Sequence, residues 1–143
     1  FQKIFKNLKK GRYDKKFKNL AGQWLSVAYE FLGKINKKKV DNNQASIYIK
    51  EFIFCIASAY KAVNKDFFKH TYDFINEVKK LSLKQKGTAN LMELLLNQKN
   101  TSFIKRKTEK LWVNTNYYMQ NLDVQMVSYS QNNINDALRE LLK

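Results

Sequence analysis

The chain has 143 residues, 44% of them hydrophobic and 27% charged, and its 27 Lys and Arg against 12 Asp and Glu give a formal net charge of +15. This length suits one domain whose core needs no structural metal, and the single cysteine excludes an internal disulfide. The longest apolar run, from Phe52 to Tyr60, is too short to cross a bilayer, so we expect no integral membrane insertion.

The fold class that the sequence predicts is all-α. The chain contains no proline and only four glycines, so little interrupts regular structure. Apolar residues recur at helical spacing nearly throughout, without an alternating strand pattern or a repeat of fixed period. We predict a single all-helical domain over residues 1–143, which is a bundle or irregular stack of six to seven antiparallel helices with no β-sheet.

The first 40 residues predict two helices separated at Gly11, with the second presenting an apolar stripe from Tyr13 to Ile35. They carry twelve basic and two acidic side chains, so ion pairs between residues four apart are nearly missing. We therefore interpret the charged face as a surface for a polyanion. Gly22 and Gly33 are predicted on this polar side. A glycine inside an exposed helix face is favoured where another backbone approaches closely. That backbone is a neighbouring helix, a helix C-terminal turn in the case of Gly33, or a phosphodiester chain.

The middle of the chain predicts a central helix. Residues 37–43 form a polar turn in which Asp41 and its neighbours are N-cap candidates. The helix that follows, 45–63, contains FIFCIASAY, which is apolar around most of its circumference and typical of a helix inside a bundle. Cys55 is predicted to be a buried structural thiol within it.

Four further helices are predicted downstream. Asp66 is the expected cap of a helix that runs to Leu81. Thr88 is the expected cap of a short helix that carries the apolar residues Leu91, Met92, Leu94 and Leu95. Thr101 is the expected cap of a long helix that ends near Ser130. A last short helix follows residue 133.

Motifs for catalysis or metal binding are lacking. His70 is the only histidine, it lies far along the chain from Cys55, and it is interpreted as a half-exposed interface residue. No glycine-rich phosphate loop and no carboxylate pair is present. We therefore predict a non-enzymatic protein with no cofactor and no metal.

Two basic patches carry the functional prediction. The predicted phosphate ligands are Lys9, Lys10, Arg12, Lys15, Lys16, Lys37, Lys38 and Lys39 in a first patch, with Arg106, Lys107 and Lys110 in a second. Val113, Tyr117 and Val124 continue the second patch along the predicted outer line of their helix. Tyr117 either stacks on a base of single-stranded nucleic acid or packs in a second buried helix face, and we favour burial.

The leading hypothesis is a helical module that binds the phosphate backbone of nucleic acid, RNA before DNA, within a larger ribonucleoprotein or chromatin assembly. The alternative is an adaptor that mediates protein–protein interaction with an acidic partner segment. A third hypothesis is peripheral binding to anionic membranes by a detached first helix. The lone cysteine favours an intracellular, reducing compartment, which is the nucleus or the cytoplasm, with an organelle matrix as the alternative. Because the first residue is Phe, we expect a fragment or a processed product.

Overall fold

The computed structural model describes the backbone of residues 2–37, 40–66, 73–97 and 101–126, and side chains from residue 14 onward within these ranges except residues 101 and 102. Within these ranges the elements are five helices: α1 (Gln2–Ile35), α2 (Asn42–Val63), α3 (Phe74–Lys79), α4 (Thr88–Asn97) and α5 (Thr101–Asn121). No strand occurs among the described residues. The all-α prediction is confirmed, whereas the predicted number of six to seven helices exceeds the number found.

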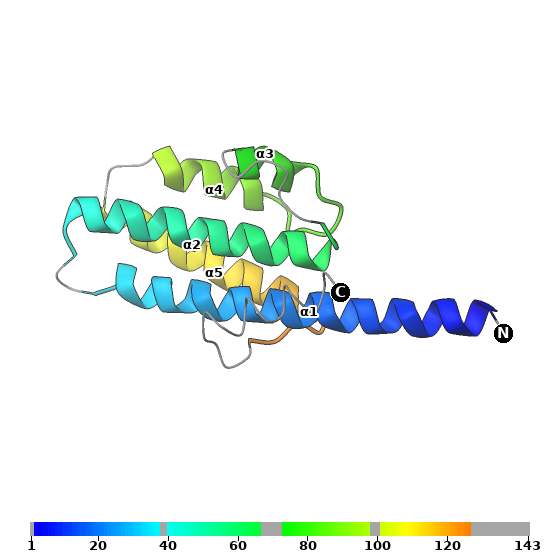
Figure 1. Cartoon of the computed structure of the whole chain (residues 1–143). Coiled ribbons are helices and arrows are strands. Elements are labelled where there is room, and N and C mark those ends of the chain that lie inside the picture. The colour runs from blue at the N-terminus through cyan, green and yellow to red at the C-terminus, as the bar shows by residue number, and fades with distance from the viewer. Residues whose placement is uncertain (1, 38–39, 67–72, 98–100, 127–143) are drawn as a thin grey trace.

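One reason for the smaller number is that α1 continues through Gly11, where the sequence predicted a break. An internal glycine costs a helix only about 1 kcal/mol relative to alanine, and no proline follows to stop it. At 34 residues α1 is about 51 Å long, against about 33 Å for the 22 residues of α2. The N-terminal end of α1 therefore extends past the antiparallel α2 (Figure 1). The helix predicted after residue 133 lies outside the described residues.

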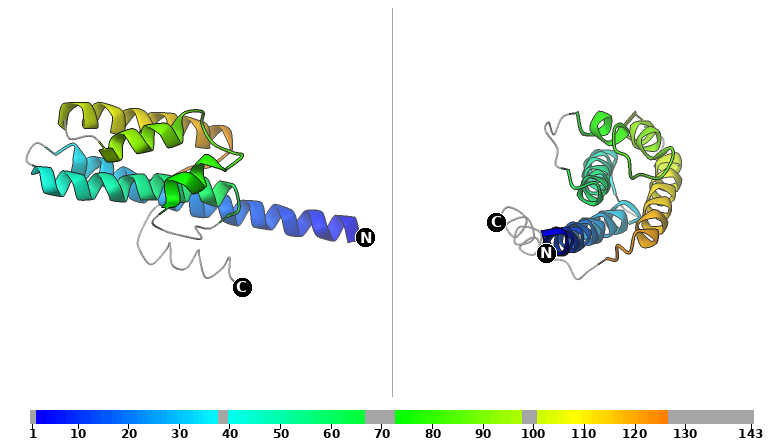
Figure 2. Two further views of the ribbon diagram at one scale, coloured as in Figure 1. Left: turned by 90° about the horizontal axis from the view of Figure 1, so that it is seen from above. Right: turned by 90° about the vertical axis from the view of Figure 1, so that its right-hand side faces the viewer.

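Helix α2 is the central helix, as the sequence predicted. The other four helices lie around it, and it contacts each of them (Figure 2). From Phe52 to Val63 nearly every side chain is buried, because the apolar residues there cover all sides of the helix. Cys55 lies in this stretch with 2% of its surface exposed, which confirms the predicted buried thiol.

The ends of α2 and α5 are fixed by local hydrogen bonds. Asp41 is the N-cap of α2, as predicted, and its Oδ1 accepts a hydrogen bond of 2.7 Å from the Gln44 N–H. Both helices finish in a Schellman turn whose left-handed residue is not glycine: Lys65 has φ 55° and Asp123 has φ 61°. The turn at Asp123 ends α5 at Asn121, well before Ser130, so the predicted length of this helix was wrong.

A buried lysine joins the end of α2 to α3. Lys61 is 3% exposed, and its Nζ lies 3.1 Å from the Asp66 carboxylate and 3.2 Å from the Glu77 carboxylate. Asp66 thus serves as a counter-charge, whereas the residue that occupies the N-cap position of α3 is Asp73. A buried ammonium requires such partners, because desolvation of an unpaired charge costs several kcal/mol.

A second buried polar cluster links α2 to α4 and α5. The Tyr60 side chain is fully buried, and its hydroxyl lies 3.3 Å from the Thr115 hydroxyl and 3.5 Å from the Thr88 hydroxyl. Thr88, which the sequence predicted as a cap, is the first residue of α4, and Thr101 likewise begins α5. The cluster holds the α4–α5 pair against the central helix.

Candidate nucleic-acid interface

The solvent face of α5 carries a line of four exposed side chains, which we call the α5 ridge: Arg106, Lys110, Val113 and Tyr117. Their spacing of four, three and four residues places them within about 60° of one another around the helix axis. Val113 is 56% exposed and Tyr117 is 66% exposed. The favoured prediction that Tyr117 is buried was therefore wrong.

The ridge is exposed because α5 buries a single face. Its inward side chains, which lie on the opposite side of the axis, are fully buried: Thr108, Leu111, Thr115 and Met119. On one flank Trp112 packs against the Tyr29 ring of α1, with 5.5 Å between ring centroids. Val124, predicted on the outer line, follows the Schellman turn instead and is 1% exposed.

The charges of the ridge are available to an external anion. Arg106 and Lys110 are exposed and form no ion pair within the described part of the chain. Lys107, predicted in the same patch, is half-buried with its ammonium 5.4 Å from the centroid of the Phe103 ring. Glu109 is the only acidic residue in the sequence of α5.

A groove between α4 and α5 adjoins the ridge. It has a volume of about 410 Å³ and is lined by Lys86, Gly87, Thr88, Asn90, Leu91, Leu94, Lys110, Leu111 and Asn114. Lys110 belongs both to the ridge and to this α4–α5 groove, and no acidic side chain lines it. Sequence reasoning missed the groove, although Asn114 lies one helical turn from Lys110 and from Tyr117 and so offered a local signal.

The first predicted patch divides into two regions along α1. Lys15 and Lys16 are exposed near the middle of α1, and Lys37 is exposed beyond its C-terminal end. Roughly 29 Å of helix separates Lys16 from the last residue of α1, so these groups do not form one continuous patch. The side chains of Lys9, Lys10, Arg12, Lys38 and Lys39 lie outside the described residues.

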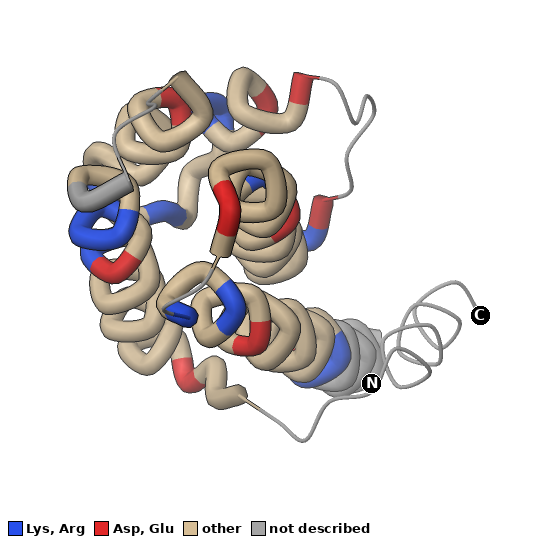
Figure 3. Tube along the Cα trace, turned by 90° about the vertical axis from the view of Figure 1, so that its left-hand side faces the viewer, with Lys and Arg blue, Asp and Glu red and all other residues tan. Residues whose placement is uncertain are grey.

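The end of α1 that precedes Lys37 lies at the same end of the molecule as the first turns of α5. The two helices are neighbours that run in opposite directions, and Lys and Arg occur on both at this end (Figure 3). The contact between Tyr29 and Trp112 agrees with this alignment. Basic residues far apart in the sequence are thus brought to one end of the bundle.

The two glycines predicted on the polar face of α1 differ in environment. Gly22 is buried, which excludes contact with a phosphate chain there. Gly33 is exposed, and a Cβ built on it would have no atom within 4 Å. The prediction that both lie on one exposed face was wrong because the same side of α1 is covered at Gly22 and open at Gly33.

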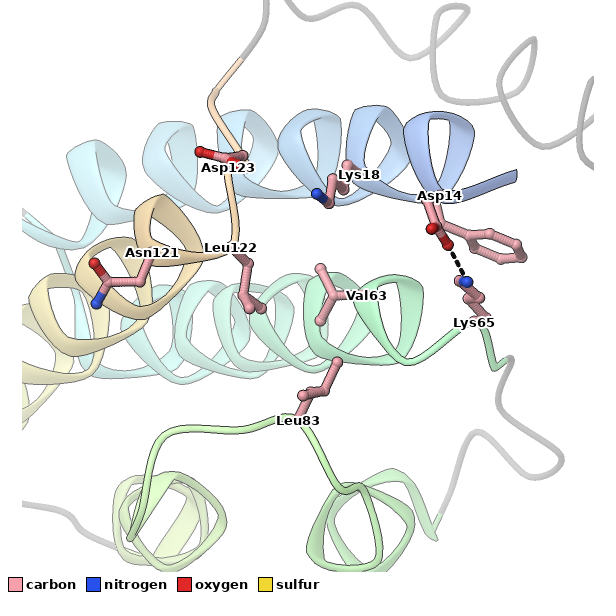
Figure 4. Close-up of a pocket in the computed structure, with 9 residues that line it drawn as sticks. Asp14, Lys18, Val63, Lys65, Leu83, Asn121, Leu122 and Asp123 are labelled. Atoms are coloured by element: carbon pink, nitrogen blue, oxygen red, sulfur yellow. Dashed lines mark ion pairs between the residues drawn. The ribbon is translucent and has the colours of Figure 1, made fainter. Parts of the chain in front are cut away.

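A second pocket, of about 380 Å³, lies where α1, the end of α2 and the end of α5 meet (Figure 4). It contains charges of both signs: Lys18, Asp123, and the ion pair between Asp14 and Lys65. Because its carboxylates would repel phosphate, this pocket suits a polyanion less well than the acid-free α4–α5 groove does.

Burial shifts the pKa of two described side chains, Cys55 and Tyr60. Burial, and secondarily the Glu51 carboxylate, raises the pKa of the Cys55 thiol from 9.0 to about 12, so the thiol is neutral. Burial also raises the pKa of Tyr60 above its usual value. No cluster of three His, Cys, Asp or Glu side chains suited to a metal occurs within these ranges, and His70 lies outside them.

Along the same ranges, none of the helices combines the length and the hydropathy needed to span a bilayer. Comparison with protein-family models, with curated proteins and with solved structures finds no match to this chain. The fold alone therefore defines the class of this protein, which is an all-α protein with helices packed around a central α2.

Proposed function

We propose that this protein is a non-enzymatic helical module that binds single-stranded nucleic acid, with RNA preferred to DNA, through the α5 ridge. The observation that carries the proposal is the alignment of two cations with no ion-pair partner among the described residues and one exposed aromatic ring on a single line of α5. Cations that contact phosphates and rings that stack on bases are the two components of single-strand binding.

The exposure of Tyr117 favours a single strand over a duplex. A ring that is 66% exposed on a convex helix face has room for an unstacked base, whereas paired bases are already stacked on each other. Lys15 and Lys16 near the middle of α1 add a second, purely electrostatic contact for a longer strand.

The experiment measures the affinity of a labelled single-stranded RNA by fluorescence anisotropy at about 50 and about 200 mM salt. Each phosphate contact adds about 0.7 to the slope of log affinity against log salt for a single strand, so Arg106→Gln with Lys110→Gln lowers that slope by about 1.4. The matched control is Lys50→Gln with Lys80→Gln, which removes the same charge from exposed positions elsewhere on the molecule and leaves the slope within about 0.3 of the parent.

Tyr117→Ala tests the stacking component. We expect an affinity loss of about tenfold, and Tyr117→Phe retains the affinity because the ring remains. Equal slopes for the ridge and control variants contradict the proposal, as does a parent protein that does not bind RNA or DNA at the lower salt. Binding of an acidic peptide in place of nucleic acid would support the adaptor alternative.

A further inference from the structure

The α4–α5 groove has the dimensions of a small-molecule site. Its volume of about 410 Å³ lies within the range of about 300–1,000 Å³ that ligand pockets occupy. It is formed by two antiparallel helices and by the segment that precedes α4, where Gly87 has φ 83°. The buried hydroxyl cluster at Thr88 fixes one wall against the core.

The lining of the groove separates into apolar and polar parts. Leu91 and Leu94 provide the accessible apolar surface, and Leu94 is 37% exposed, whereas the fully buried Leu111 forms the floor beneath them. The amides of Asn90 and Asn114 lie beside them and form no hydrogen bond within the described part of the chain. Each of these amides offers two N–H donors and a carbonyl acceptor to a ligand.

Charge determines which ligand suits this lining. Lys86 and Lys110 are both exposed, and the groove contains no carboxylate. A nucleotide has a flat ring with hydrogen-bond donors and acceptors on its edge, and it has an anionic phosphate attached through its sugar. An acidic peptide would satisfy the two lysines, and its backbone would hydrogen-bond the two asparagine amides, but its backbone offers no flat ring to the leucine surface.

We infer that the α4–α5 groove receives one unpaired nucleobase, with Asn90 and Asn114 bonded to its edge and Lys86 and Lys110 at its phosphates. This inference rests on the proposed function and specifies how the same surface engages a strand. Tyr117 lies about 10 Å farther along α5 than Lys110, so a neighbouring base reaches the exposed ring while the first occupies the groove.

The experiment compares an oligouridylate of about twelve nucleotides with an abasic ribose-phosphate strand of equal length, both labelled for anisotropy at about 50 mM salt. The comparison is made in the Tyr117→Ala variant, so that stacking on the exposed ring does not contribute, and this protein binds the base-containing strand at least about tenfold more tightly. Asn90→Ala with Asn114→Ala removes most of this difference and leaves the affinity for the abasic strand unchanged. The control is Asn42→Ala with Asn43→Ala, exposed residues in the first turn of α2, and it retains the difference.

A structural readout accompanies the affinities. In a titration followed by NMR, the side-chain amide signals of Asn90 and Asn114 shift with the oligouridylate and stay unshifted with the abasic strand. Circular dichroism establishes that each variant retains the helical content of the parent.

Failure of the inference is distinguishable from failure of the proposed function. If the two strands bind with equal, salt-dependent affinities, the groove does not bind a nucleobase, whereas phosphate binding by the protein still holds. A base preference that the Asn90 and Asn114 variants do not change also overturns the inference. If neither strand binds, both proposals are refuted. If an acidic amphipathic peptide binds and its affinity depends on Asn90 and Asn114, the groove is a site for a protein partner and not for a nucleobase.

Discussion

Replacement of the buried Lys61 by methionine is expected to destabilise the protein by about 3 kcal/mol. Methionine fills a similar volume, so the effect isolates the charge. The variant leaves Glu77, whose side chain is 16% exposed, without the ammonium that lies 3.2 Å away. Removal of one partner from a fully buried pair costs about 3–5 kcal/mol, and we take the lower end because Asp66 is 51% exposed and remains hydrated.

The assay is urea denaturation followed by circular dichroism, together with the variants Glu77→Gln and Lys61→Met/Glu77→Gln. The double variant also removes the charge of Glu77, so it is expected to recover about 2 kcal/mol relative to the sum of the single variants. Lys50→Met is the matched control on the exposed face of α2, and it changes the free energy of unfolding by less than about 0.5 kcal/mol.

Either of two results would overturn this expectation. A cost below about 1 kcal/mol for Lys61→Met would mean that the ion pairs at the end of α2 contribute no more than surface pairs do. Additive effects of Lys61→Met and Glu77→Gln would mean that these two side chains are not energetically coupled, whatever their separation.

Two more predictions concern single positions. Asp123→Gly is expected to raise the free energy of unfolding by about 0.5–1 kcal/mol in the same assay, because glycine adopts a φ of 61° without steric cost. The control Gln120→Gly, within α5, is expected to lower the free energy of unfolding by about 1 kcal/mol. A destabilised Asp123→Gly variant would contradict the left-handed turn at this position. At about pH 8, Cys55 in the native protein is expected to react with iodoacetamide roughly a thousandfold more slowly than in the urea-unfolded protein. The reason is that a pKa raised from 9.0 to about 12 reduces the thiolate fraction by that factor. Native and unfolded reaction rates within about tenfold of each other would contradict the burial of the thiol.

The candidate interface was only partly accessible to sequence reasoning. The basic residues Arg106 and Lys110 were identified from charge alone, and the structure places both on an exposed line. Tyr117 was assigned to a buried face because its helix was expected to be covered on two sides. The α4–α5 groove depends on the approach of two helices, so only its α5 wall had a local signal in the sequence.

Sequence reasoning was sufficient for the all-α class, the central position of α2, the N-cap at Asp41 and the burial of Cys55. These features follow from local periodicity and from hydrogen bonds between residues close in the chain. Tertiary packing was needed to establish which side of α5 stays uncovered, why Gly22 is buried while Gly33 is open, and which cations share an end of the bundle. The physical reason is that a helix face is buried or exposed according to the neighbours that pack on it, and those neighbours come from distant parts of the chain.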